Sequence, residues 1–133
     1  MASIAVAKWI DNQRFVATAG SNHSIVMDGD RATANSPMEM VLLGLCGCTG
    51  YDVVSILRKK REPLTSLEVS AEADRAPEPP TIFTAIRLTY RVSGKVSPKA
   101  VEDAVRLSEE KYCSVAAILR TSAKITYTIE YTE

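Results

Sequence analysis

The sequence predicts a single α+β domain, and three features of its 133 residues lead to that prediction. Short apolar segments separated by turn residues come first, a long apolar helix follows, and the remainder alternates between period-two and helical patterns. The resulting order of three strands, a helix, two strands, two helices and a strand is typical of an α+β fold. We expect one domain, 1–133, with N-terminal strands in 1–35, a central helix in 36–61, and a second sheet with helices in 62–133.

Three short strands are expected before residue 31. Apolar segments at 4–9, 13–19 and 24–27 have the length and composition of strands. Asp11-Asn12, Gly20-Ser21-Asn22 and Asp28-Gly29-Asp30 separate and end them with residues that favour tight turns. Consecutive strands with short turns predict a β-meander.

A long helix is expected next, from Pro37 to about Lys60. Ser36 is a cap residue, a proline takes the first helical position and Glu39 the third, which is a strong start signal. Residues 40–57 are apolar nearly all round, so the helix is either buried on most sides or placed in a membrane. Asp52 would be costly in lipid, and the amphipathic strands on both sides need a core, so we favour burial. Glycines at 44, 47 and 50 would let a partner approach closely.

The second half predicts two strands, two helices and a final strand. Residues 67–74 alternate between apolar and polar, and 82–92 do so more cleanly. The proline-rich segment 76–80 between them must be a turn. Ser97-Pro98 repeats the cap-and-proline signal for a helix that should fade near Lys111, and a short helix should begin around 112–114. Residues 124–131 alternate again and end the fold as a strand.

Composition limits the possible functions. The 16 basic and 16 acidic residues give a net charge of zero, so there is no global field to attract nucleic acid or an anionic membrane. The N-terminus lacks a secretory signal pattern, and three cysteines argue against a disulfide scaffold, so we expect a cytoplasmic protein. Cys46 and Cys48 point apart on a helix and the chain has one histidine, so we expect no metal and no cofactor.

Two cysteines could carry chemistry. Cys48 lies in the middle of the apolar helix, where a core cysteine is the simplest interpretation and burial would raise its thiol pKa. Cys113 falls at the expected start of a short helix, where backbone N–H groups and the helix dipole favour a thiolate. These two residues are far apart in the sequence, and spacing alone does not bring them together.

The sequence around these cysteines resembles a known family. Residues 36–49, SPMEMVLLGLCGCT, continued by DVVSIL at 52–57, resemble the first cysteine helix of the OsmC/Ohr superfamily. Residues 111–115, KYCSV, resemble its second cysteine motif. With Gly20-Ser21-Asn22-His23 and Val26-Met27-Asp28-Gly29, the resemblance covers nearly the whole chain and is greatest to the short YhfA-like branch.

The resemblance implies a fold and an activity. The OsmC-like fold would be an intertwined homodimer in which two central cysteine helices pack together and β-sheets wrap around them. In the implied reaction, the Cys48 thiolate attacks an organic hydroperoxide and becomes a sulfenic acid. Cys113 then condenses with it to a disulfide, which an external dithiol reduces.

The resemblance also implies an arginine and a glutamate that activate the first cysteine. Arg14, on the second strand, is the candidate arginine, and a solvated strand residue is the alternative interpretation of it. The family glutamate directly follows the helix-start proline, whereas here Met38 takes that place and Glu39 comes one residue later. Glu39 is therefore either the activating acid or only a capping residue. Ser114 also departs from the family, in which a proline is usual.

Two other functions remain open at this point. A dimer of the same fold could bind a fatty acyl or other apolar ligand with both cysteines inert, or it could act as a thiol redox sensor with little turnover. Cys46 is interpreted as a packing residue, and His23 as an exposed loop residue or a wall of the peroxide pocket.

Overall fold

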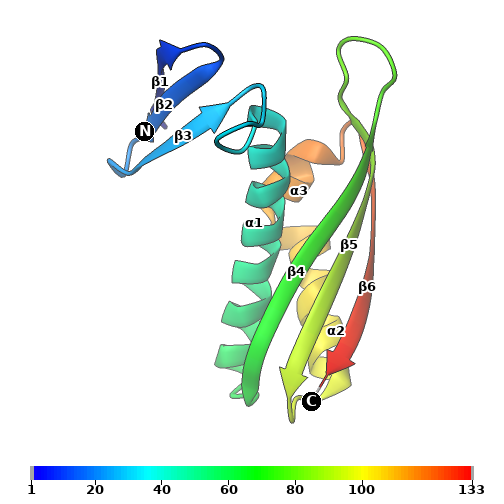
Figure 1. The fold of residues 1–133 in the computed structure, drawn as a ribbon. Coiled ribbons are helices and arrows are strands. Elements are labelled where there is room, and N and C mark those ends of the chain that lie inside the picture. Colours follow the sequence, from blue (N-terminus) through cyan, green and yellow to red (C-terminus); the bar gives the residue numbers. More distant parts are fainter. Residues whose placement is uncertain (1, 133) are drawn as a thin grey trace. The chain divides into compact units, whose positions relative to one another are not determined.

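The structure is a computed structural model that describes residues 2–132. The chain forms two compact units, one ending at Leu43 and the other beginning at Gly44. Figure 1 shows the order of the elements, which matches the predicted order of strands and helices throughout. The single-domain assignment stays a prediction.

The first unit contains an antiparallel meander. Strands β1 (Ala5–Asp11), β2 (Arg14–Ala19) and β3 (Ser24–Asp28) pair in the order β1-β2-β3. Asn12 and Asn22, in the two turns, have φ of 44° and 67°. Asparagine tolerates this left-handed region better than most residues, which explains why the turns fall where the sequence places them. The predicted β-meander is confirmed.

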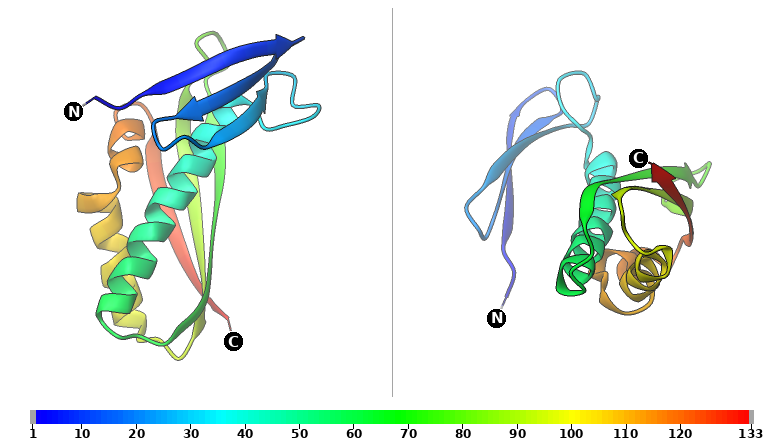
Figure 2. Two further views of the ribbon diagram at one scale, coloured as in Figure 1. Left: turned by 90° about the vertical axis from the view of Figure 1, so that its left-hand side faces the viewer. Right: turned by 90° about the horizontal axis from the view of Figure 1, so that it is seen from below.

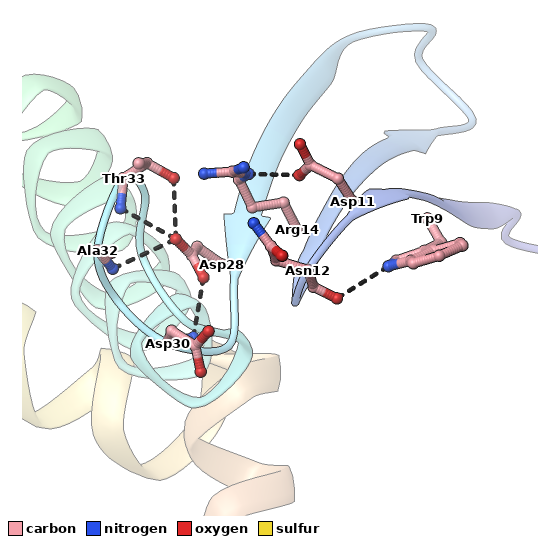
Figure 3. A network of polar contacts seen from close by, with 8 residues as sticks. All are labelled: Trp9, Asp11, Asn12, Arg14, Asp28, Asp30, Ala32 and Thr33. Atoms are coloured by element: carbon pink, nitrogen blue, oxygen red, sulfur yellow. Dashed lines mark hydrogen bonds and ion pairs between the residues drawn. The ribbon is translucent and has the colours of Figure 1, made fainter.

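A loop after β3 is organised by one buried carboxylate. Asp28 is 2% exposed and accepts hydrogen bonds from the backbone N–H groups of Asp30 (2.8 Å), Ala32 (3.2 Å) and Thr33 (3.0 Å). The Thr33 hydroxyl donates a further bond of 2.8 Å (Figure 3). These donors, led by the Thr33 hydroxyl, hold the pKa of Asp28 below its usual value. The loop therefore has a fixed course into the helix that follows.

Helix α1 (Pro37–Lys59) begins with the predicted capping box. The Glu39 backbone N–H donates to Ser36 Oγ at 3.2 Å, and the Ser36 N–H donates to Glu39 Oε1 at 2.8 Å. Two orphan donors of the helix start are thereby satisfied. Basic residues Arg58 and Lys59 lie in the last turn, where they complement the helix dipole.

The second unit is a three-stranded sheet with helices on one face. Strands β4 (Leu64–Arg75) and β5 (Phe83–Gly94) are antiparallel, and β6 (Lys124–Thr132) pairs parallel to β5. Helix α2 (Pro98–Leu107) lies beside the second-unit part of α1 on that face (Figures 1 and 2). The element η1 (Ser108–Tyr112) and helix α3 (Ser114–Leu119) lead back to β6.

The core of the second unit lies between this sheet and its helices. The apolar side chains at alternate positions of β5 are almost fully buried, as the period-two pattern predicts. Positions one turn apart on α1 and the apolar side of α2 complete the core. The central buried residues are Leu45, Val53, Leu57, Ile86, Leu88, Tyr90, Val92, Val101, Ala104 and Val105.

One local feature differs from the expected helix. The predicted helix that fades near Lys111 ends as an α-helix at Leu107 and continues as a π-helical turn, η1, to Tyr112. Cys113 then caps α3, at the start of the short helix as the sequence predicts. A π turn has a wider ladder of hydrogen bonds than an α-helix, and it is set by tertiary contacts that the local pattern does not contain.

Helix α1 is long and apolar enough to span a membrane by composition, with a mean hydropathy of 1.8. Only 22% of that apolar window is buried within the chain. However, Leu45, Val53 and Leu57 are fully buried in the core of the second unit. This packing favours the interpretation of α1 as a core helix whose other side is left apolar and exposed.

Candidate functional site

Two cysteines and an aspartate converge in the second unit. Cys48 lies in the middle of α1, Asp52 follows it one helical turn later, and Cys113 lies between η1 and α3. The two Sγ atoms and a carboxylate oxygen of Asp52 all lie within 4.8 Å of one another. Residues four apart share a helix face, so the sequence places Cys48 beside Asp52. Only the return of the chain through α2 and η1 brings Cys113 to them.

Asp52 is tied to the segment that carries Cys113. The hydroxyl of Ser108, the first residue of η1, donates to Asp52 Oδ2 at 2.9 Å. Ser108 is fully buried, and its carbonyl accepts a 2.8 Å hydrogen bond from the Cys113 backbone N–H. This serine therefore connects the carboxylate to the backbone that positions the second cysteine.

The environment of Cys113 corrects one prediction from the sequence. Its Sγ accepts a 3.3 Å hydrogen bond from the Ala116 backbone N–H, which favours the thiolate as expected for a cap position. Burial acts in the opposite direction and is stronger: the side chain is 3% exposed, and the pKa of Cys113 rises to about 12. Neighbouring Cys48 and Asp52 raise it further. The expectation of a favoured thiolate at Cys113 was therefore wrong.

We expect Cys113 to react slowly with alkylating agents in the reduced, folded protein. At pH 7.5 a thiol with a pKa of about 12 carries very little thiolate, so iodoacetamide should label Cys113 at least about 100-fold more slowly than in the urea-unfolded chain. Peptide mass spectrometry after timed labelling measures this rate, with half-buried Cys46 as the internal reference. Equal labelling of Cys113 in the folded and unfolded protein would show that its thiol is neither buried nor held protonated.

A buried polar group supports η1 from the sheet side. Glu109 is 7% exposed, and the Tyr90 hydroxyl donates to its Oε2 at 2.7 Å. Arg120 donates to the Glu109 carbonyl and has a nitrogen 3.7 Å from Oε1. Burial raises the pKa of Glu109, while the Tyr90 hydrogen bond and the Arg120 charge oppose that rise. The sequence analysis did not identify this group, because its three members come from separate elements.

Arg14 and Glu39, the two predicted activating residues, lie in the first unit. Arg14 Nε is 2.6 Å from Asp11 Oδ1, and this hydrogen bond lowers the pKa of Asp11 (Figure 3). Glu39 completes the capping box with Ser36, which lowers the pKa of Glu39. Both interactions hold these side chains locally, and their role toward Cys48 stays a prediction.

Cys46 and His23 have simple local environments. Cys46 is half-buried, and burial raises its pKa. It lies two residues from Cys48, which places it on a different side of the helix. His23 is exposed, with its Nδ1 3.0 Å from the Ser21 hydroxyl. Trp9 is 68% exposed in this chain, so it forms no part of the core of residues 2–132.

The cysteine–aspartate cluster also has donor atoms of the kind that bind metal. Two sulfurs and one carboxylate oxygen suit zinc by ligand type, but structural zinc sites use four protein ligands and this cluster supplies three. The expectation that the protein needs no metal stays a prediction.

A groove of about 510 Å³ borders the cluster through Asp52. Its walls come from the later turns of α1 and from the end of α2 with η1. The lining residues are Tyr51, Asp52, Ser55, Ile56, Lys59, Lys60, Leu107 and Tyr112. Asp52 is thus the member of the cluster that lines this groove.

Comparison with known proteins gives a consistent result. The family model described as OsmC-like protein matches residues 28–128. Protein YhfA of Escherichia coli strain K12 is 44% identical over 128 residues, which cover 95% of this chain and 96% of that protein. These matches include the whole cysteine helix and the second cysteine motif.

Solved structures with the same fold include both a hypothetical protein and a hydroperoxide resistance protein. A hypothetical protein from Aquifex aeolicus VF5 is 30% identical, with a TM-score of 0.87 over 100% of this chain and 99% of that one. The organic hydroperoxide resistance protein OsmC from Legionella pneumophila has a TM-score of 0.72 over 98% and 97%, at 14% identity. The similarity to the Legionella pneumophila protein, at this low identity, shows a shared fold alone.

Proposed function

The chain belongs to the OsmC-like protein family, and on that premise we propose that it reduces organic hydroperoxides with Cys48 and Cys113. Structural neighbours with the same fold include organic hydroperoxide resistance proteins, which supports this class of substrate. We expect the protein to act in the cytoplasm, where dithiol reductants keep cysteines reduced.

One observation carries this proposal. Cys48 lies in α1 and Cys113 caps α3, and the two are distant in the sequence, yet their sulfurs lie within 4.8 Å of each other. Both are free thiols. Two sulfurs at this separation need to move by a few ångströms to reach the bonding distance of about 2.05 Å. Two cysteines that served only for packing would not require their sulfurs to lie so close to each other.

The first step oxidises Cys48. Its thiolate attacks the outer oxygen of the hydroperoxide, so a sulfur–oxygen bond forms, the oxygen–oxygen bond breaks and the alcohol leaves after taking a proton. Cys48 becomes a sulfenic acid. The surrounding helix is apolar, which favours an alkyl hydroperoxide over the strongly hydrated hydrogen peroxide.

The second step joins the two cysteines. Cys113 sulfur attacks the sulfenic sulfur of Cys48, a disulfide forms, and the sulfenic oxygen leaves as water. An external dithiol then reduces the disulfide by exchange and returns both thiols for another turnover.

A stoichiometric reaction tests the proposal. Reduced protein is mixed with one equivalent of cumene hydroperoxide in the absence of reductant, and peptides are analysed by mass spectrometry. We expect a Cys48–Cys113 disulfide and one equivalent of cumyl alcohol, formed faster than the same disulfide with hydrogen peroxide. Loss of no thiol, or oxidation of Cys46 alone, would contradict the proposal. A retained lipid together with inert thiols would favour an apolar-ligand-binding protein.

We further propose that the protein acts as a homodimer through the exposed side of α1. Side chains on this side are apolar or absent: Tyr51 is 73% exposed, and a Cβ built on Gly44 or Gly47 meets no atom of the second unit up to Thr132 within 4 Å. By contrast, a Cβ built on Gly50 would lie 3.4 Å from Val69 Cγ2 of the same chain. A second copy whose helix packs against Gly44 and Gly47 would cover this apolar side.

Substituting Gly47 by leucine tests the dimer. A larger side chain would overpack a close helix–helix contact at a cost of about 1–3 kcal/mol, so we expect the dimer dissociation constant to rise about 10- to 100-fold. Analytical ultracentrifugation measures this constant. Lys99→Leu is the matched control, because it introduces a leucine on α2 instead of on α1. Equal dimerisation of both variants would place the interface elsewhere.

A further inference from the structure

Resting on the proposed function, we propose that Asp52 is the general base of the disulfide-forming step. Its carboxylate takes the proton of the Cys113 thiol and delivers it to the oxygen that leaves the Cys48 sulfenic acid. The geometry that supports this role is the approach of one Asp52 oxygen to both reacting sulfurs, all within 4.8 Å.

The step needs a base because Cys113 does not ionise by itself near neutral pH. Burial is the main cause of its raised pKa of about 12, with Cys48 and Asp52 as the nearest groups that add to it. The Cys113 charge also raises the pKa of Tyr90, whose hydroxyl donates to Glu109. A protonated thiol is a poor nucleophile, so the proton must be removed as the sulfur attacks.

Asp52, which is half-buried, is better suited to take this proton than Glu109, the buried acid of the region. The Glu109 carboxylate is already engaged by the Tyr90 hydroxyl and by Arg120. Asp52 receives the Ser108 hydrogen bond on Oδ2, and within residues 2–132 no hydrogen bond engages its Oδ1, which can therefore accept a proton. Asp52 also borders the groove beside the cluster, where the released water can leave.

The proton and electron balance of the step is complete. The Cys113 S–H bond breaks and its proton moves to the Asp52 carboxylate, while the sulfur electron pair forms the bond to Cys48 sulfur. The Cys48 S–O bond breaks, and its electron pair leaves with the oxygen as hydroxide, which takes the proton from Asp52 and departs as water. Asp52 ends as a carboxylate. A separation of up to 4.8 Å is spanned by one bridging water or by closure in the reacting complex.

Asp52→Asn tests this role because asparagine keeps the shape and the acceptor for Ser108 but cannot accept the proton. After one equivalent of cumene hydroperoxide at pH 7, we expect disulfide formation to slow about 100-fold. Cys48 sulfenic acid should then live long enough to be trapped by dimedone and counted by mass spectrometry. Asp103→Asn, the same change on α2, is the matched control. This variant should form the Cys48–Cys113 disulfide at the wild-type rate.

The pH dependence of the rate of disulfide formation shows whether Asp52 acts as a base or only as a structural residue. In Asp52→Asn the rate should rise about tenfold per pH unit from 7 to 9, because the Cys113 thiolate itself becomes the nucleophile. In the wild type the rate should change little from pH 7 to 9, because the Asp52 carboxylate and not the solvent removes the proton of the Cys113 thiol. Ser108→Ala, which releases the carboxylate from its hydrogen bond, should give an intermediate rate.

The outcomes distinguish this inference from the proposed function. A wild-type rate that itself rises tenfold per pH unit, or an Asp52→Asn deficit that is constant with pH, would overturn the role of Asp52 while leaving the peroxidase intact. Wild-type protein that forms neither a sulfenic acid at Cys48 nor the Cys48–Cys113 disulfide would overturn the proposed function first. The wild-type profile decides the question even if the asparagine variant folds poorly.

Discussion

Cys48→Ser should reduce the rate of organic hydroperoxide reduction by about 1000-fold or more. Serine keeps the shape of the side chain, but at neutral pH its hydroxyl supplies no nucleophile comparable with a thiolate. The other parts of the site, including Asp52 and Cys113, cannot compensate because the first bond forms at Cys48. Steady-state consumption of cumene hydroperoxide with excess dithiothreitol measures the loss.

Cys46→Ser is the matched control for this experiment. It makes the same chemical change two residues away on the same helix, on a different side from Cys48. Cys46 is not among the residues whose sulfur or oxygen atoms meet at the cluster. We expect this variant to keep the wild-type rate. An unchanged rate in Cys48→Ser, or an equal loss in both variants, would refute Cys48 as the attacking residue.

Gly94→Ala should destabilise the second unit by about 3 kcal/mol or more and lower the Tm by about 10 °C. Gly94 ends β5 with φ of +117°, a conformation that side chains rarely adopt. A Cβ there would lie 2.9 Å from the Thr65 backbone nitrogen and closer still to the Pro63 carbonyl oxygen. Both neighbours are backbone atoms, so the start of β4 would have to move.

Thermal and urea unfolding followed by circular dichroism would measure this effect. Gly20→Ala is the control, because its added Cβ would meet no described atom closer than 3.8 Å and its φ is not in the left-handed region. We expect Gly20→Ala to stay within about 0.5 kcal/mol of the wild type. A Gly94→Ala protein as stable as this control would show that the β4–β5 junction is looser than the structure has it.

The secondary structure was largely predictable because its signals are local. The capping box at Ser36 and Glu39 gives the start of α1 from four consecutive residues. The alternation along β5 gives both the strand and its buried face, since successive side chains point to opposite sides. By contrast, η1 was expected as ordinary helix, because its wider turn is held by buried contacts of Ser108 and Glu109 with other elements.

The candidate site was predictable only in part. Cys48 and Cys113 were identified by resemblance, and the spacing of Cys48 and Asp52 already places them on one helix face. The Tyr90–Glu109–Arg120 group has no local pattern, because its members come from β5, η1 and the end of α3. A buried carboxylate is recognised by its partners, which the sequence does not specify.

By itself, then, the sequence determined the order of elements, the buried face of β5 and the family. Tertiary structure alone decided that the sulfurs of Cys48 and Cys113 approach each other beside Asp52, and that the Cys113 thiol stays protonated at a helix start. The reason is that the two kinds of interaction act over different distances along the sequence. Periodicity and capping act over a few residues, whereas desolvation and sulfur–carboxylate proximity depend on segments that only the folded chain brings together.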